Sequence, residues 1–155
     1  MNEEFQQTNA NEIELLAFRL GEQEYCLDIM SVREIRGWAK ATPLPFSPPH
    51  VKGVINLRGT VLPVHDLAVR LGMSPAAESE RNVIIVVDAN GHTAGLLVDA
   101  VSDIVAVAPS ALQNPPDIAQ GETLNCIKYL TLIEGRLIRV LELSLVLPNG
   151  GTEAA

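Results

Sequence analysis

The sequence has few aromatic residues and no long apolar run. Aromatic residues make up 4% of the 155 residues and hydrophobic residues 47%, so a core must be built from Val, Ile, Leu and Ala. Stretches rich in β-branched residues favour strands. The longest apolar run, Val83 to Val87, is far shorter than the roughly 20 residues that a membrane-spanning helix needs. We therefore expect a mostly β protein with no direct membrane insertion.

Positive charge is also scarce. The formal net charge is −8, and the basic residues are scattered, with Arg33 and Arg36 as the densest pair. Binding to a phosphate backbone needs concentrated positive charge. The sequence therefore argues against nucleic acid and anionic lipid as partners. The acidic excess helps to keep an apolar-rich chain in solution.

Catalytic and metal-binding motifs are missing from the sequence. His50, His65 and His92 lie apart in a loop, at a strand end and in a hairpin turn, whereas a metal site needs three or four converging ligands. Asp66 follows His65, but adjacent strand residues point to opposite faces, so helix capping is the better role for Asp66. Cys26 has no basic neighbour to activate its thiol. These patterns predict a protein that is not an enzyme and that holds no cofactor or metal.

Short alternating segments separated by turns predict four β-hairpins. Gly59 and Gly135 lie in two of these turns, where we expect them to supply a positive φ. Asp66 should begin one short helix and Glu142 a second. Four prolines within 43–49 predict a loop, because proline cannot donate to a sheet. The predicted strand pairs are 15–20 with 25–29, 53–57 with 60–64, 83–87 with 93–98, and 127–133 with 136–141.

The second half of the chain repeats the pattern of the first. The stretch 59–67 matches 135–143, with a glycine, paired apolar residues and an acidic residue at the same spacing. Units this small bury little surface alone, so we expect two small antiparallel barrels on a shared apolar core, with short helices. An exchange of terminal strands between the barrels stays open. The predicted division is a flexible segment 1–13, a single domain 14–147 (first barrel about 14–72, connector 73–81, second barrel about 82–147) and a flexible tail 148–155.

The most specific signal is a set of motifs that spans nearly the whole chain. They are Gly53-Val54-Ile55-Asn56-Leu57-Arg58-Gly59-Thr60-Val61-Leu62-Pro63-Val64-x-Asp66-Leu67, Glu24-Tyr25, Asp28-Ile29, Val32-x-Glu34-Ile35-Arg36-Gly37 and Gly95-Leu96-x-Val98-Asp99-x-Val101-Ser102-Asp103. Together they resemble the CheW family from Glu14 to Leu147, in the family's order.

This resemblance implies two SH3-like five-stranded barrels around a common core. It implies a non-enzymatic chemotaxis adaptor that binds the regulatory domain of a CheA-type histidine kinase and the cytoplasmic tip of methyl-accepting chemoreceptors. We expect such a protein in the cytoplasm, recruited to membrane-associated receptor arrays, with Cys26 and Cys126 reduced, although the cysteine count alone leaves one disulfide open. The alternative is a paralogue that serves twitching, gliding or second-messenger control.

The resemblance also implies a set of partner-binding positions. Arg58 is either an interface residue that grips partner oxygens or a brace of its turn, paired with Glu34. For the apolar members of the set, barrel core is an equal alternative to interface, and for Gly53 and Gly95 the alternative is close strand packing. Trp38, outside the set, is either a lid over the core, which we favour, or an exposed aromatic anchor of an interface. The predicted partner-binding residues are Arg58, Glu34, Val32, Val101, Ile104, Gly53, Val83 and Gly95.

Overall fold

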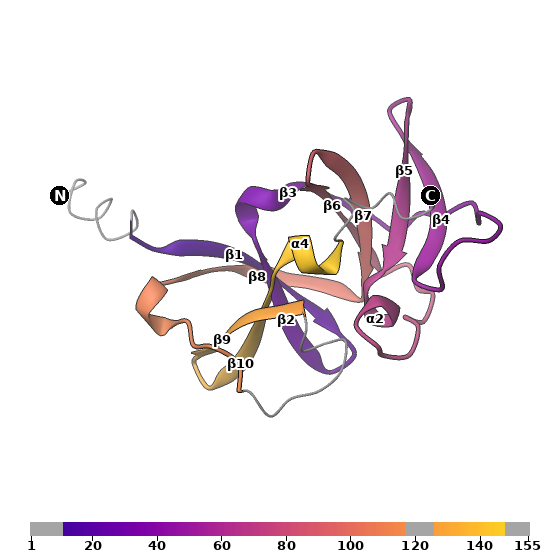
Figure 1. The fold of residues 1–155 in the computed structure, drawn as a ribbon. Helices are drawn as coiled ribbons and strands as arrows, with labels where there is room; N and C mark the ends of the chain where they lie inside the picture. The colour runs from indigo at the N-terminus through magenta and orange to yellow at the C-terminus, as the bar shows by residue number, and fades with distance from the viewer. Residues whose placement is uncertain (1–10, 117–125, 148–155) are drawn as a thin grey trace.

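The computed structural model describes residues 11–116 and 126–147 (Figure 1). Within these residues, ten strands form two five-stranded sheets. The first sheet has the strand order β8-β1-β2-β10-β9, and the second has the order β3-β6-β7-β5-β4. The strands are β1 (Ile13–Leu20), β2 (Gln23–Asp28), β3 (Val32–Gly37), β4 (Val51–Leu57), β5 (Thr60–Asp66), β6 (Val83–Ala89), β7 (His92–Val98), β8 (Ala100–Val107), β9 (Ile127–Ile133) and β10 (Arg136–Leu141).

Short helices follow some of the strands. Asp66 caps α2 as predicted, because its Oδ1 accepts hydrogen bonds from the backbone N–H of Ala68 at 3.1 Å and of Val69 at 3.4 Å. Glu142 precedes α4 as predicted, but its side chain pairs with Lys128 at 3.1 Å and does not cap the helix. The helices are η1 (Ile29–Ser31), α2 (Leu67–Arg70), η2 (Pro109–Ala111) and α4 (Leu143–Val146).

The four predicted hairpins are all present as antiparallel strand pairs in the described part of the chain. In the β4–β5 turn, φ is 51° at Arg58 and 88° at Gly59; in the β9–β10 turn, it is 52° at Glu134 and 81° at Gly135. Two consecutive residues with positive φ are typical of the type I′ turn, whose twist matches that of the flanking strands. The predicted role of both glycines is confirmed.

The two sheets do not follow the predicted division of the chain at 73–81. The predicted first barrel, 14–72, supplies β1 and β2 to the first sheet and β3, β4 and β5 to the second, while β8, β9 and β10 join the first sheet. The strand exchange that the sequence left open is therefore present. The sheets are also mixed and not antiparallel, since β2 pairs in parallel with β10 and β5 with β7. These pairings join segments that are distant in the sequence, which local turn signals do not reveal.

The apolar core lies partly between the sheets and partly within each sheet. Successive strand residues point to opposite faces. In β6, Ile85 and Val87 contribute to a cluster shared by both sheets, whereas Ile84 and Val86 belong to a cluster of the second sheet alone. Residues of β1, β2, α2 and α4 complete the shared cluster. The predicted shared core is thus confirmed, and Trp38 packs on the second sheet's own cluster, as expected of a lid.

The predicted flexible ends fall largely outside the described residues, which begin at 11 and end at 147. Ile13, which the sequence places in the flexible segment, is the first residue of β1 and pairs with Val107 of β8. The first sheet therefore begins one residue before the predicted domain boundary at 14.

Candidate partner-binding surfaces

Two edge strands, β3 of the second sheet and β8 of the first, border the shared core. Val32 of β3 pairs with Val87, and Val101 of β8 pairs with Phe18. Both partners belong to the shared core, and residues opposite each other on neighbouring strands share a face. The side chains of Val32 and Val101 therefore cover one core from the edges of two different sheets.

Val83 and Ile104 extend this border. Val83 begins β6 and packs on the shared core, as Val32 and Val101 do, and all three are half-buried. Ile104 of β8 pairs with Leu16 of the shared core and is 56% exposed, which makes it the most accessible of the four. We call these four residues the apolar rim: Val32, Val83, Val101 and Ile104.

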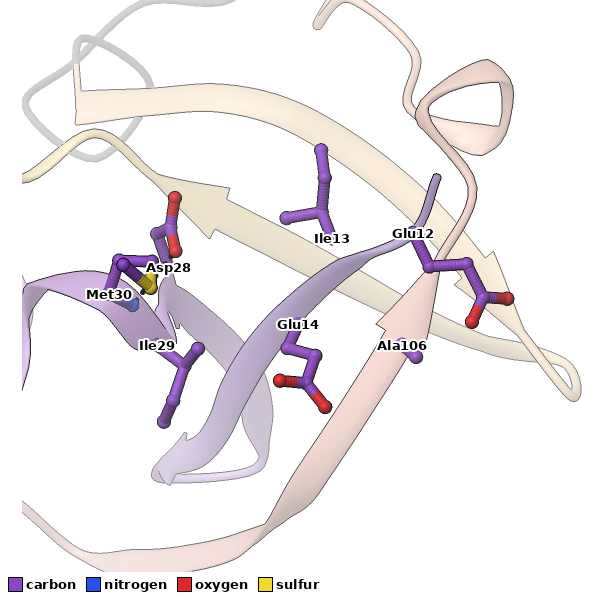
Figure 2. A pocket seen from close by; sticks show the side chains of 7 residues that line it. All are labelled: Glu12, Ile13, Glu14, Asp28, Ile29, Met30 and Ala106. Atoms are coloured by element: carbon purple, nitrogen blue, oxygen red, sulfur yellow. Dashed lines mark hydrogen bonds between the residues drawn. The ribbon is translucent and has the colours of Figure 1, made fainter. Parts of the chain in front are cut away.

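A cleft of about 460 Å³ lies further along β8, where Ala106, two residues after Ile104, forms part of its wall. Figure 2 shows Asp28 and Met30 on one side of this cleft and Glu12 and Ala106 on the other. The carboxylate of Asp28 accepts a hydrogen bond from the backbone N–H of Met30 at 2.9 Å, which fixes the turn into η1. The apolar side chains that line the cleft are Ile13, Ile29, Met30 and Ala106, and the acidic ones are Glu12, Glu14 and Asp28.

Arg58 and Glu34 form an ion pair across the second sheet. Arg58 lies in the β4–β5 turn at one edge of the sheet and Glu34 lies in β3 at the other. The Arg58 Nη2 donates to Glu34 Oε1 at 2.6 Å, and Arg36 donates to the second carboxylate oxygen at 3.3 Å. The hydrogen bond from Arg58 is the largest of the causes that lower the pKa of Glu34. The pair that the sequence offered as one of two alternatives for Arg58 is present, and it brings the two edges of the sheet together.

The brace does not exhaust the hydrogen-bonding capacity of Arg58. A guanidinium carries five N–H donors, and among the described residues Arg58 donates to Glu34 only. Its side chain is 69% exposed. Arg58 can therefore hold Glu34 and still offer donors to oxygens of a partner, so the structural and the interface roles are compatible.

Gly53 and Gly95 are buried and serve close packing. Gly53 has a φ of 148°, and a Cβ atom there would overlap the backbone carbonyl of Thr42. A Cβ atom at Gly95 would lie 2.8 Å from the Cγ2 of Ile84, a contact that real Cβ atoms do not make. Because both positions face the interior, a partner would sense them only through the packing of the second sheet.

The cysteine and histidine side chains of the described residues give little support for catalysis or metal binding. Burial raises the pKa of the Cys26 thiol to about 12, which opposes formation of a nucleophilic thiolate. Cys26 and Cys126 are both free and buried. His50 and His65, which the sequence placed apart, stack with ring centroids 5.2 Å apart. No group of three or more His, Cys, Asp or Glu residues in the described part of the chain could hold a metal.

Sequence reasoning missed a clamp around Arg136. Its Nε and Nη2 donate to the two carboxylate oxygens of Glu24 at 2.9 and 2.5 Å, and Nη2 lies 3.8 Å from Asp103 Oδ1. The three residues come from β10, β2 and β8, so the clamp joins three strands of the first sheet. The hydrogen bond from Arg136 lowers the pKa of Glu24. Since 112 positions separate Glu24 from Arg136, no local pattern signals the contact.

Two small sheets on a shared core, with a partly exposed apolar rim, define a β-sheet scaffold module. Comparison with known proteins agrees with this class. The family model for the CheW-like domain matches residues 14–149. None of the helices in the described residues is long and apolar enough to cross a membrane.

Individual relatives and a solved structure extend the match. The chain is 51% identical over 142 residues to a chemotaxis protein CheW of Rhizobium meliloti, covering 92% of each chain. It is 48% identical over 147 residues to a probable chemotaxis protein CheW of Rhizobium etli, covering 95% of each. The crystal structure of the scaffolding protein TtCheW from Thermoanaerobacter tengcongensis superposes with a TM-score of 0.81 at 31% identity, over 90% of this chain and 95% of that one.

The chain belongs to the CheW family. It is a non-enzymatic chemotaxis scaffold protein that couples receptors to the kinase CheA. The predicted fold class, family and function are confirmed, with mixed sheets in place of antiparallel ones.

Proposed function

We propose that the apolar rim binds the cytoplasmic tip of methyl-accepting chemoreceptors and that the regulatory domain of a CheA-type kinase binds outside it. One observation carries this proposal: side chains from the edges of two different sheets are partly exposed over a single core. A partner that packs on such a rim continues the core packing of the protein and removes more apolar surface from water. A kinase domain bound elsewhere leaves the rim free, as simultaneous coupling requires.

Polar contacts would fix the position of the receptor on the rim. Glu34 lies two residues after Val32 on β3, so the Arg58–Glu34 pair stands next to the rim. The remaining donors of Arg58 suit carbonyl and carboxylate oxygens. In this arrangement Gly53 and Gly95 act indirectly, by keeping the second sheet tightly packed.

In this role the protein works in the cytoplasm, at membrane-associated receptor arrays, without entering the membrane. A contact of the usual size buries about 800 Å² on each partner. Repetition of such contacts in an array strengthens weak individual interactions through multivalency. Each single contact can therefore have modest affinity.

The test compares Ile104→Ser with the control Leu132→Ser in pull-downs with a receptor cytoplasmic fragment and with the kinase regulatory domain. Leu132 is 61% exposed and lies on β9, at the far edge of the first sheet from β8. We expect Ile104→Ser to lose receptor binding and keep kinase binding, and Leu132→Ser to keep both. Unchanged receptor binding by Ile104→Ser, at an unchanged melting temperature, would contradict the proposal.

A further inference from the structure

A pocket of about 240 Å³ lies beside the β4–β5 turn, on the face of the second sheet that carries this sheet's own core cluster. Its floor consists of Leu57, Leu62 and Val86, which are at most 8% exposed and belong to that cluster. The mouths of small β-barrels are common ligand sites. An engineered apolar cavity of about 150 Å³ binds benzene, so this pocket has room for a compact apolar group together with a polar one.

A β-bulge in β3 brings two neighbouring charged residues to this pocket. Val32 lies opposite Val87 and Glu34 lies opposite Val86, so Arg33 is an extra residue in the register. In a regular strand, Glu34 would share the face of Val32, which covers the shared core. The bulge places Glu34 on the other face, and both Arg33 and Glu34 line the pocket. Bulges that re-aim side chains in this way are frequent next to functional sites.

Positive charge predominates at the mouth of the pocket. Arg33 and Arg58 line it from opposite edges of the second sheet, and Arg36 stands beside it through its hydrogen bond to Glu34. Two carboxylates, those of Glu34 and Asp88, accept hydrogen bonds from these three guanidiniums. Three positive and two negative charges give a formal charge of +1, in a protein whose net charge is −8. The mouth therefore favours a ligand with a single negative charge.

Both guanidiniums in the lining keep donors for such a ligand. Arg33 uses its Nη1 for the two oxygens of Asp88, at 3.2 and 3.0 Å, and Arg58 uses its Nη2 for Glu34. A guanidinium carries five N–H donors, and neither arginine donates to any further residue in the described part of the chain. The side chain of Arg33 is 57% exposed and that of Arg58 69%. Thr60 adds a hydroxyl to the lining.

The order of groups along the pocket distinguishes a free ligand from a side chain of a partner protein. The apolar surface lies at the buried floor and the guanidiniums lie at the exposed mouth, so a fitting ligand enters with its apolar end first. An Asp or Glu side chain of a partner would enter with its carboxylate first. Its charge would then lie against Leu62 and Val86, and burial of an unpaired charge is costly. The pocket is therefore better suited to a free small molecule.

We propose that this pocket binds a small monocarboxylate with a compact apolar tail. The tail contacts Leu57, Leu62 and Val86, and the carboxylate accepts hydrogen bonds from Arg33 and Arg58 at the mouth. The planar fork of a guanidinium matches the two oxygens of a carboxylate. Binding at this site needs no partner protein, so it is independent of the receptor contact proposed above.

The test is a nuclear magnetic resonance titration of the full chain, labelled at its leucine and valine methyl groups, with sodium benzoate at constant ionic strength. The methyl resonances of Leu57, Leu62 and Val86 should shift and saturate with a Kd of about 1 mM or below, which a ligand of this size can reach. The resonances of Leu132 and Leu137, exposed on the β9–β10 hairpin, should stay unchanged. Benzamide, which has a similar shape without the charge, should bind at least about tenfold more weakly.

Two variants remove one guanidinium each and keep part of its stem. Arg33→Gln and Arg58→Gln should each raise the Kd for benzoate at least about tenfold, because each deletes charge-assisted hydrogen bonds. Both side chains are exposed, so both variants should fold and melt within a few degrees of the wild type. The control Arg81→Gln changes the net charge equally at an exposed position outside the pocket lining and should bind benzoate as the wild type does.

The proposal fails on any of three results. The first is the absence of saturable shifts at Leu57, Leu62 and Val86, or equal shifts at Leu132 and Leu137. The second is benzamide that binds as tightly as benzoate, since the guanidiniums would then play no part. The third is an equal rise in Kd in Arg81→Gln, which would indicate attraction by overall charge and not by a built site.

Discussion

Gly95 offers a direct way to separate packing from partner contact. In the structure, a Cβ atom at this position would lie 2.8 Å from the Cγ2 of Ile84, and the next contacts, with side chains of Leu62 and Val64, would be at 3.6 Å. The close contact is therefore with one methyl group. Ile84 is fully buried and β-branched, so its side chain has little freedom to move away.

Gly95→Ala should destabilise the protein through this single overlap. Overpacking of a core costs about 1–3 kcal/mol, and replacement of glycine returns about 0.4–1 kcal/mol by restricting the unfolded chain. The net loss is then roughly 0–2.6 kcal/mol, and each kcal/mol lowers the melting temperature by about 2–4 °C in a domain of this size. Any loss of partner binding should follow from this change in packing, because the position faces the interior and can act on a partner only indirectly.

A double-mutant cycle with Ile84→Ala tests the assigned cause. Ile84→Ala alone should cost about 2–5 kcal/mol, as deletion of a buried isoleucine does. In the double variant the methyl group added by Gly95→Ala occupies part of the space that the shortened side chain leaves, so the combined loss in urea unfolding should be smaller than the sum by about 1 kcal/mol or more. Additive losses would refute the packing argument.

Three further predictions concern polar residues. Arg58→Ala should weaken receptor or kinase binding in a titration while the melting temperature stays within a few degrees. Arg58→Lys, which lacks the planar fork, should restore binding only in part. Normal affinity in Arg58→Ala would exclude the interface role. The hydrogen bond from Arg136 lowers the pKa of Glu24 from its ordinary value of 4.5, so the pair stabilises the fold above pH 4.5 and loses this effect as the pH falls through the lowered pKa. In Arg136→Met, the free energy of unfolding should therefore depend less on pH in this range. An unchanged pH dependence would count against the clamp. Asp66→Ala should cost about 0.5–2 kcal/mol of unfolding free energy through loss of the α2 cap, with Asp66→Asn as the milder control; equal stability of Asp66→Ala and wild type would contradict the capping role.

Local features of the fold could be predicted because their causes lie within a few residues. The positive φ at Gly59 and Gly135 follows from two-residue turns between alternating segments. The cap at Asp66 follows from an acidic residue immediately before an apolar helical stretch. The Arg58–Glu34 pair is one of two alternatives that the sequence leaves open, and the structure contains it. In the two turns and the cap a short stretch of sequence fixes the backbone, whereas the members of the Arg58–Glu34 pair lie 24 positions apart.

Long-range features could not be predicted in the same way. The parallel pairing of β2 with β10 joins Glu24 to Ile138, and no turn or spacing connects them. The same pairing places Arg136 beside Glu24, so the clamp follows from a topology that the sequence left open. The prolines around Phe46 predict a loop, but the left-handed φ of Phe46 and its exposure depend on hydrogen bonds that fix the loop in three dimensions. Composition alone carried none of this information.

The strand exchange bears on how a scaffold of this size joins two partners. Neither half of the chain contains all the strands of either sheet, so neither sheet can complete its hydrogen-bonded ladder without the other half. Arg70, which ends α2, reinforces this connection by donating to the carbonyls of Leu145 and Val146 in α4. The rim residues Val32 and Val101 sit on different sheets that pack on one core, and a packed core resists relative sliding of its layers. A displacement that a partner causes at the rim therefore affects both sheets together. Two independently folded barrels on a flexible linker would not have this property.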